Sequence, residues 1–131
     1  MNELPKLGFS TLAALAEDSS RITGECTCRS ASLAGWESVP LSLIEENLQE
    51  MGTLLDDPFI EPTFAEFHPS GTRYASPNAP IAPRYFPYNR CIVARCTACG
   101  RYFLRYTEAG GYFLDRRIRL LSSELLVDAA L

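Results

Sequence analysis

The apolar positions of the N-terminal half repeat with the spacing of amphipathic helices. Leu12, Leu15 and Ala16 recur at helical spacing behind Ser10, which can cap a first turn. This pattern predicts a short helix near the start of the chain. We interpret residues 1–57 as an acidic, helical part.

A second, longer helix is predicted over residues 41–51. Ser42 and Glu45 have the spacing of a capping box, and Gly52 is placed to end the helix. The apolar side chains and the carboxylates of this segment fall on opposite faces: Leu41, Ile44, Leu48 and Met51 against Glu45, Glu46 and Glu50. The pattern predicts a helix with a buried stripe and an acidic outer face.

Residues 58–87 follow neither the helical nor the strand period. Seven of the nine prolines of the chain lie there, and each proline removes a backbone donor and fixes φ. Within this proline-rich irregular segment, only residues 63–67 have the pattern of a strand. An irregular stretch of this length in a compact domain usually binds something or wraps the core.

From residue 88 onward the alternation of a β-strand replaces helical spacing. Residues 91–95 form one β-rich run, and residues 101–106 form a second run that has Tyr102, Leu104 and Tyr106 on one face. A turn at 108–111 and a return strand from 112 to 120 complete an antiparallel meander. We predict one α+β domain over residues 1–131, with N-terminal helices packed on the sheet of a β-rich part, 88–131.

Charge is segregated along the chain, although the net charge is only −4. Residues 1–72 carry twelve acidic and three basic side chains, whereas residues 73–131 carry nine basic and four acidic ones. The two halves can attract each other within one globule, or they can present an acidic and a basic face to different partners.

Four of the five cysteines form two close pairs, Cys26 with Cys28 and Cys96 with Cys99. Two thiolates at this spacing can bind one metal ion from a single turn, and two such turns make the four-thiolate shell that structural Zn²⁺ favours. Gly100, directly after the second pair, suits a turn in which the backbone takes a positive φ. The pattern predicts one structural Zn²⁺ on these four cysteines and a fold that brings the pairs together.

Residues 91–120 resemble one half of a zinc ribbon, because strand, Cys-x-x-Cys-Gly, strand, turn and strand follow one another there. The resemblance implies that the sheet under the helices is an antiparallel, zinc-ribbon-like one. A typical ribbon supplies a second Cys-x-x-Cys, whereas this chain has Cys26-x-Cys28 far upstream. Cys91 has the setting of a buried core thiol and could replace a ligand. His68, the one histidine, is expected to make ordinary hydrogen bonds in a loop or to act as a fourth ligand.

The sequence favours a protein without catalytic activity. It contains no Gly-x-Ser-x-Gly motif and no P-loop, and a zinc ion with four cysteine ligands has no open position for water. No apolar run reaches membrane-spanning length and no signal peptide is recognisable, so we expect a cytoplasmic protein. A reducing compartment favours metal-bound thiolates over disulfides.

Protein binding is the function that the acidic side chains favour. A small acidic protein without catalytic groups is suited to covering a basic surface on a partner, such as a toxin or an enzyme. In this general character the chain is similar to bacterial toxin-immunity proteins, which are inhibitors that block a toxin. The expected contact residues are Glu45, Glu46, Glu50, Asp56, Asp57 and Glu61.

Binding of RNA or single-stranded DNA is the alternative. Residues 84–119 interleave arginines, which can bind phosphates, with aromatic side chains, which can stack on bases. The candidate residues of this face are Arg84, Arg90, Arg95, Arg101, Arg105, Tyr85 and Tyr88. Alternating aromatic side chains can equally form the core of a small zinc ribbon. The chain also has a net negative charge, whereas a nucleic-acid-binding domain usually carries a basic surface.

Overall fold

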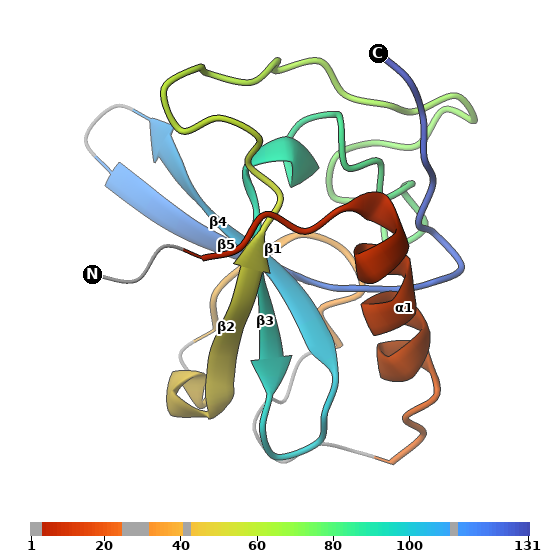
Figure 1. Ribbon diagram of the computed structural model, residues 1–131, viewed down its shortest axis with the longest axis vertical. Helices are drawn as coiled ribbons and strands as arrows, with labels where there is room; N and C mark the ends of the chain where they lie inside the picture. Colours follow the sequence, from red (N-terminus) through yellow and green to blue (C-terminus); the bar gives the residue numbers. More distant parts are fainter. Residues whose placement is uncertain (1–3, 25–31, 41–42, 111–112) are drawn as a thin grey trace.

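The computed structural model describes residues 4–24, 32–40, 43–110 and 113–131. Its elements in chain order are the helix α1 (Phe9–Ser20), β1 (Glu37–Ser38), the 3₁₀ helix η1 (Glu45–Asn47), β2 (Leu48–Thr53), the 3₁₀ helix η2 (Tyr88–Arg90), β3 (Ile92–Cys96), β4 (Tyr102–Gly110) and β5 (Phe113–Leu120). The strands form one antiparallel sheet in the order β1-β5-β4-β3-β2, and α1 lies beside it (Figure 1). The fold is therefore α+β and mostly sheet.

The meander predicted for the C-terminal half is formed by β3, β4 and β5. Ile92 of β3 lies opposite Arg105 of β4, and β4 pairs with β5 along its whole length from Phe103 opposite Leu120. Because side chains alternate along a strand, this register puts the buried Tyr102, Leu104 and Tyr106 on one face of the sheet, as predicted.

Both faces of the sheet carry an apolar core. The helix-side core, which packs against α1, includes Leu12, Ala16, Trp36, Tyr88, Cys91, Val93, Leu104 and Tyr106. The opposite core consists of the buried residues Leu33, Leu43, Cys96, Phe103 and Ile118. The centre of the sheet is therefore covered on both sides, and the cysteine turn belongs to the opposite core.

The first predicted helix is present as α1. It buries Leu12 and Ala16, as the periodicity indicates, but its N-cap is Gly8, and no side chain caps it. At its other end the Ser19 hydroxyl accepts a hydrogen bond from the Tyr102 backbone amide at 3.0 Å, which joins the helix to β4. Within the described ranges, no helix has both the length and the apolar character that crossing a membrane requires.

The second predicted helix is wrong, because residues 45–47 form a single 3₁₀ turn and β2 begins at Leu48. Residues 41 and 42 of that prediction lie outside the described residues. Leu48 packs against the opposite core and Met51 against the helix-side core, because side chains alternate along a strand and residues three positions apart point to opposite faces. Both faces of the sheet are covered, so both positions are apolar, and their three-residue separation imitates helical spacing. Pairing with β3 supplies the backbone hydrogen bonds that a helix would otherwise make internally.

Gly52 lies within β2 and does not end a helix. A Cβ atom at this position would come within 2.5 Å of the Leu7 Cγ atom. The chain around Leu7 is hydrogen-bonded to the same strand, since the Leu7 amide donates to the Thr53 carbonyl and the Thr53 amide to the Pro5 carbonyl, both at 2.9 Å. A glycine is needed here because the N-terminal segment lies directly against β2.

The proline-rich segment is irregular, as predicted, but the strand expected at residues 63–67 is not formed. The segment arches over one end of the sheet (Figure 1). It is held by scattered backbone hydrogen bonds, such as the one from the Phe86 amide to the Ala65 carbonyl and the one from the Ile81 amide to the Leu125 carbonyl, both 2.8 Å long. Because Ile81 is fully buried, the segment closes the helix-side core.

Arg119 of β5 is fully buried, an unusual position for a charged side chain. None of the described carboxylates pairs with its guanidinium, which instead donates to four neutral oxygens from three other segments. The acceptors are the carbonyls of Ala34 at 2.9 Å, Ala79 at 2.8 Å and Pro77 at 3.2 Å, and the hydroxyl of Tyr88. One side chain therefore joins β5, the segment before β1, the proline-rich segment and η2.

We expect Arg119→Met to destabilise the fold by about 3 kcal/mol or more, because it leaves several buried oxygens without a donor. Chemical denaturation followed by tryptophan fluorescence measures the loss of stability. Trp36 is a suitable probe because it lies against Tyr88, whose hydroxyl accepts a hydrogen bond from Arg119. Arg84→Met is the matched control, because Arg84 forms only a half-exposed ion pair with Asp128 and should cost less than about 1 kcal/mol. Equal losses in the two variants would contradict the role of Arg119.

Candidate functional site

The Cys-x-x-Cys sequence forms a tight turn between β3 and β4. The Cys96 amide donates to the Arg101 carbonyl at 2.8 Å, and the Gly100 amide donates to the Cys96 carbonyl at 2.7 Å. Gly100 has a φ of +86°, so the prediction of a positive φ at this glycine is confirmed. The Thr97 amide also donates to the Asn47 carbonyl at 2.7 Å, which fastens the turn to η1.

Of the four predicted zinc ligands, Cys26 and Cys28 lie outside the described residues. Cys96 is buried and Cys99 is half-buried, and both belong to the opposite core. Within the described part of the chain, no group of three or more histidine, cysteine, aspartate or glutamate side chains is arranged to hold a metal ion. The site with four cysteine ligands therefore remains a prediction.

The two substitute ligands considered from the sequence have other surroundings. Cys91 is fully buried in the helix-side core, where its thiol donates to the Pro87 carbonyl at 3.2 Å and burial raises its pKa well above the ordinary value. His68 makes hydrogen bonds within its own loop, to the Thr72 hydroxyl at 2.7 Å and the Glu66 carboxylate at 2.8 Å. Both side chains thus follow the plainer expectation, a core thiol and a loop histidine.

Residues from both sides of the undescribed segment 25–31 lie beside the cysteine turn. Before it, the Arg101 guanidinium donates to the Ile22 carbonyl at 3.1 Å and to the Gly24 carbonyl. After it, Leu33 belongs to the same apolar cluster as Cys96. The chain therefore leaves and re-enters the described structure close to the second cysteine pair.

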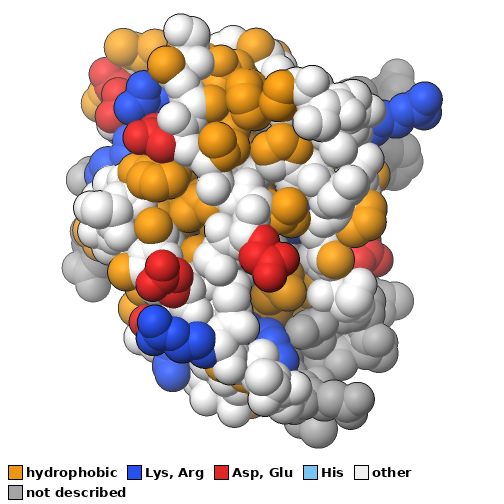
Figure 2. All heavy atoms as spheres, turned by 90° about the vertical axis from the view of Figure 1, so that its right-hand side faces the viewer, with side chains coloured by type: hydrophobic (Ala, Val, Ile, Leu, Met, Phe, Trp, Pro, Cys, Tyr) orange, Lys and Arg blue, Asp and Glu red, His pale blue; other side chains and the backbone are white. Residues whose placement is uncertain are grey.

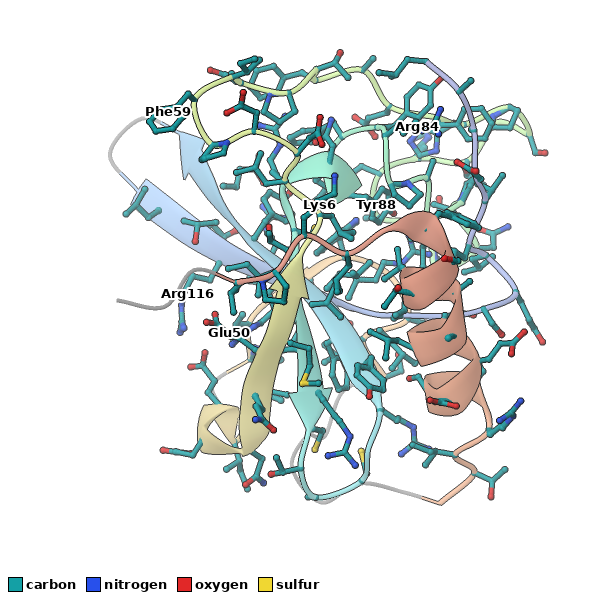
Figure 3. The ribbon with its side chains drawn as sticks, in the orientation of Figure 1. Lys6, Glu50, Phe59, Arg84, Tyr88 and Arg116 are labelled. Carbon is teal, nitrogen blue, oxygen red and sulfur yellow. The ribbon has the colours of Figure 1, made fainter. Side chains whose placement is uncertain are left out.

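The carboxylates expected to bind a partner fall into two separate groups. Glu45 binds Arg116 through two hydrogen bonds, of 2.5 and 3.0 Å, and Arg105 lies 3.9 Å from Glu45 and 3.5 Å from Glu50. The hydrogen bonds from Arg116 lower the pKa of the Glu45 carboxyl. Figure 3 shows Glu50 and Arg116 close together on the side of the sheet away from α1. Glu45 and Glu50 therefore bind arginines of the chain's own C-terminal half, whereas Glu46 is exposed.

The second group of carboxylates surrounds a cleft between the N-terminal segment, the loop after β2 and the segment that leads to η2. The cleft has a volume of about 400 Å³, and a neighbouring hollow of about 190 Å³ shares Lys6, Leu54, Pro83 and Arg84 with it. Its apolar lining consists of Leu54, Leu55, Ile60, Pro62, Pro83 and Leu131. We call it the apolar cleft.

Charged side chains and exposed apolar side chains lie beside one another at the apolar cleft. Lys6 pairs with Asp56 at 3.2 Å, while Asp57 accepts a hydrogen bond from the Phe59 amide at 2.9 Å. Phe59 is 94% exposed and Ile60 is 66% exposed, and Figure 3 shows Phe59 on the outer side of its loop. On the face that carries α1, Figure 2 shows apolar side chains gathered in the upper half, beside acidic and basic side chains at the upper left.

Most of the arginines expected to bind nucleic acid are bound within the protein. Arg90 donates to the carbonyls of Pro62 and Thr63, both at 3.0 Å, and stacks on Phe64 and Phe86. Among the other residues of this prediction, Arg84 pairs with Asp128, Arg101 with backbone carbonyls and Arg105 with two glutamates. Tyr88 is buried, and the Tyr85 hydroxyl donates to the Ala130 carbonyl at 2.5 Å. These side chains bind different internal partners and do not form one continuous arginine and aromatic face.

Sequence reasoning missed two features of these sites. It did not identify Arg119 as a buried hydrogen-bond donor, and it did not identify Phe59 and Ile60 as exposed apolar side chains. The two apolar residues do carry a signal, because Asp57-Pro58-Phe59-Ile60-Glu61-Pro62 places them between acids and prolines, which favour the surface. Comparisons of the chain with protein-family models, curated proteins and solved structures find no match.

The ion pairs of Glu45 should make stability depend on acidic pH. Because the folded-state pKa of Glu45 is lowered, its contribution is present above the unfolded value of about 4.3 and is lost as the pH falls through the folded value. Glu45→Gln should therefore be less stable than the wild type at neutral pH, and the difference should shrink in acid. Urea unfolding at a series of pH values measures this.

Glu46→Gln is the matched control for that measurement, because it changes the same group on the next residue without removing a described ion pair. A constant stability difference between Glu45→Gln and the wild type across the acidic range would contradict the electrostatic role of Glu45.

Proposed function

We propose that this protein is a non-catalytic binding module that docks a partner protein at the apolar cleft. The observation that carries the proposal is the exposure of Phe59 and Ile60 beside a cleft that is lined largely by apolar side chains. Single exposed apolar residues are ordinary on protein surfaces, but neighbouring ones that adjoin a concave apolar site are typical of interaction sites.

The charge around the apolar cleft indicates what kind of segment it binds. Lys6 is balanced by Asp56 and Arg84 by Asp128, which leaves Asp57 and Glu61 as carboxylates that no described cation pairs with. The proposed occupant is therefore a segment of a partner protein that places an apolar side chain in the cleft and lysine or arginine beside it. A basic toxin or enzyme that this protein inhibits, as an immunity protein would, fits this description.

The sequence-based partner site is modified by this proposal. Asp56 and Asp57 line the apolar cleft, and Glu61 lies between two lining residues of the same loop. All three therefore stay in the proposed interface. Glu45 and Glu50 leave it, because their carboxylates are already engaged by Arg105 and Arg116.

Synthetic nonapeptides can test the proposed occupant before any partner is identified. Three fluorescent peptides would carry a central leucine and phenylalanine flanked by lysine and arginine, the same apolar pair flanked by glutamate, or the basic residues around glycine and serine. We expect the first peptide to bind at least about tenfold more tightly than the others, which corresponds to about 1.4 kcal/mol. Ile60→Asp should abolish this preference.

Leu114→Asp is the control variant, because Leu114 is also exposed, at 75%, but lies in the β4–β5 hairpin and does not line the cleft. Equal binding of the three peptides, or an Ile60→Asp variant that binds as the wild type does, would contradict the proposal. Dimerisation that Ile60→Asp abolishes would assign the cleft to a second copy. Tighter binding of a single-stranded oligonucleotide, weakened steeply by salt, would favour the nucleic-acid alternative.

We also propose that one structural Zn²⁺, bound by Cys26, Cys28, Cys96 and Cys99, stabilises this module. The proposal is supported by the tight turn at the second pair, by the positive φ of Gly100, and by the position of Gly24 and Leu33 next to that turn. The metal would clamp the N-terminal half to the sheet and add stability that a core of this size lacks.

Metal analysis tests the zinc proposal directly. Protein purified without added metal should contain about one zinc per chain, and Cys96→Ser or Cys99→Ser should lose the metal and several kcal/mol of stability. Cys91→Ala, a change in the other core, should keep the zinc and cost about 1 kcal/mol. Small and equal effects of all three substitutions would rule out the proposed ligand set.

A further inference from the structure

Two adjoining hollows form a single groove on this protein. The apolar cleft, of about 400 Å³, and its neighbour of about 190 Å³ share Leu54 and Pro83 in their lining. Leu54 is buried, so it lies at the base of both hollows. Lys6 and Arg84 also border both, and Figure 3 shows these two side chains near the N-terminal end of α1. We call the neighbour of the apolar cleft the small hollow.

The small hollow has apolar side chains of its own. Leu7 and Phe9 line it in addition to the shared residues, and both are half-buried. Gly8, which lies between them in the chain, borders open space, because a Cβ atom on it would meet no atom within 4 Å other than those of its chain neighbours. An apolar side chain of a ligand therefore finds apolar surface in the small hollow as well as in the apolar cleft.

Charge distinguishes the two ends of the groove. The two cations belong to both hollows, so they do not contribute to the difference. Among the described residues, the apolar cleft adds the carboxylates of Asp56 and Asp57, whereas the small hollow adds that of Asp128. Asp128 is paired with Arg84 at 3.5 Å. The excess of negative charge is therefore at the end that the apolar cleft forms.

We propose that this groove binds a short extended segment of the partner protein through two apolar anchors of unequal size, with lysine or arginine beside the larger one. The larger anchor enters the apolar cleft, and the smaller one enters the small hollow. Because the hollows share lining residues, the anchors must be neighbours on one face of the segment. Alternate side chains of an extended chain, roughly 7 Å apart, meet this condition.

The inference rests on the proposed function and deepens it. It adds a second anchor, and it specifies which of the two anchors lies next to the positive charge of the partner. A segment with the basic residues beside its smaller anchor would place them at the end of the groove where Lys6 and Arg84 outnumber the carboxylate of Asp128.

Four fluorescent nonapeptides test the order of the anchors. Each carries phenylalanine and leucine two positions apart and two lysines. The lysines stand beside the phenylalanine in one pair of peptides and beside the leucine in the other pair, and each pair contains both chain directions. We expect one peptide of the first pair to bind at least about tenfold more tightly than both peptides of the second pair.

Filling the small hollow tests the second anchor. Gly8→Leu places a side chain in the open space, so it should weaken binding of the best peptide by about tenfold. It should not affect a version of that peptide in which alanine replaces the leucine. Phe9→Ser removes apolar lining instead of filling the space and should have the same selective effect. Gly24→Leu is the matched control, because a Cβ atom on Gly24 also meets nothing within 4 Å, but Gly24 lines neither hollow.

The outcomes separate this inference from the proposed function. If Gly8→Leu and Phe9→Ser affect the leucine and alanine peptides equally, or if the position of the lysines makes no difference, the inference is wrong. Loss of peptide binding in Ile60→Asp would then leave the proposed function standing. A wild type that binds none of the peptides would overturn both. Dimerisation that Gly8→Leu abolishes would assign the groove to a second copy and would also overturn the inference.

Discussion

The buried guanidinium of Arg119 is the constraint on which the rest of the structure depends. A charge removed from water must be surrounded by hydrogen-bond acceptors, and Arg119 finds them on Ala34, Pro77, Ala79 and Tyr88. Tyr88 is fixed in turn by Trp36, whose indole N–H donates to the same hydroxyl at 3.2 Å. Irregular segments that have no periodic hydrogen bonding of their own are thereby held against β5, and the helix-side core can close.

The segments held in this way form the walls of the apolar cleft. Pro83 and Asn89 line it and follow the residues that Arg119 fixes, while Leu54 follows β2 and is anchored by a 2.8 Å hydrogen bond from its amide to the Cys91 carbonyl. The proposed binding site is thus built from loops on a rigid sheet, an arrangement that lets loop residues vary while the scaffold stays constant. The cysteine turn lies at the other end of β3, so the proposed zinc would act on stability and not on the cleft directly.

Periodicity predicted the elements whose hydrogen bonds are local. The helix α1 and the β3–β4–β5 meander follow from apolar spacing, and the positive φ of Gly100 follows from the chemistry of a tight turn. The same reasoning failed at β2, because both faces of this strand are covered, and Leu48 and Met51, which point to opposite cores, have the three-residue spacing of a helix. It also failed for Glu45 and Glu50, whose pattern suggests a solvated acidic face, because their arginine partners are distant in sequence.

By itself, then, the sequence determined the α+β character, the meander, the first helix and the tight turn at Cys96, since each depends on residues within one segment. Only the tertiary structure decided that Arg119 is buried, that β2 is a strand and that Arg105 and Arg116 bind glutamates of the chain's own N-terminal half. The physical reason is that the free energy of a charge or of a strand depends on which distant segment packs against it. The local sequence pattern contains no information about that long-range contact.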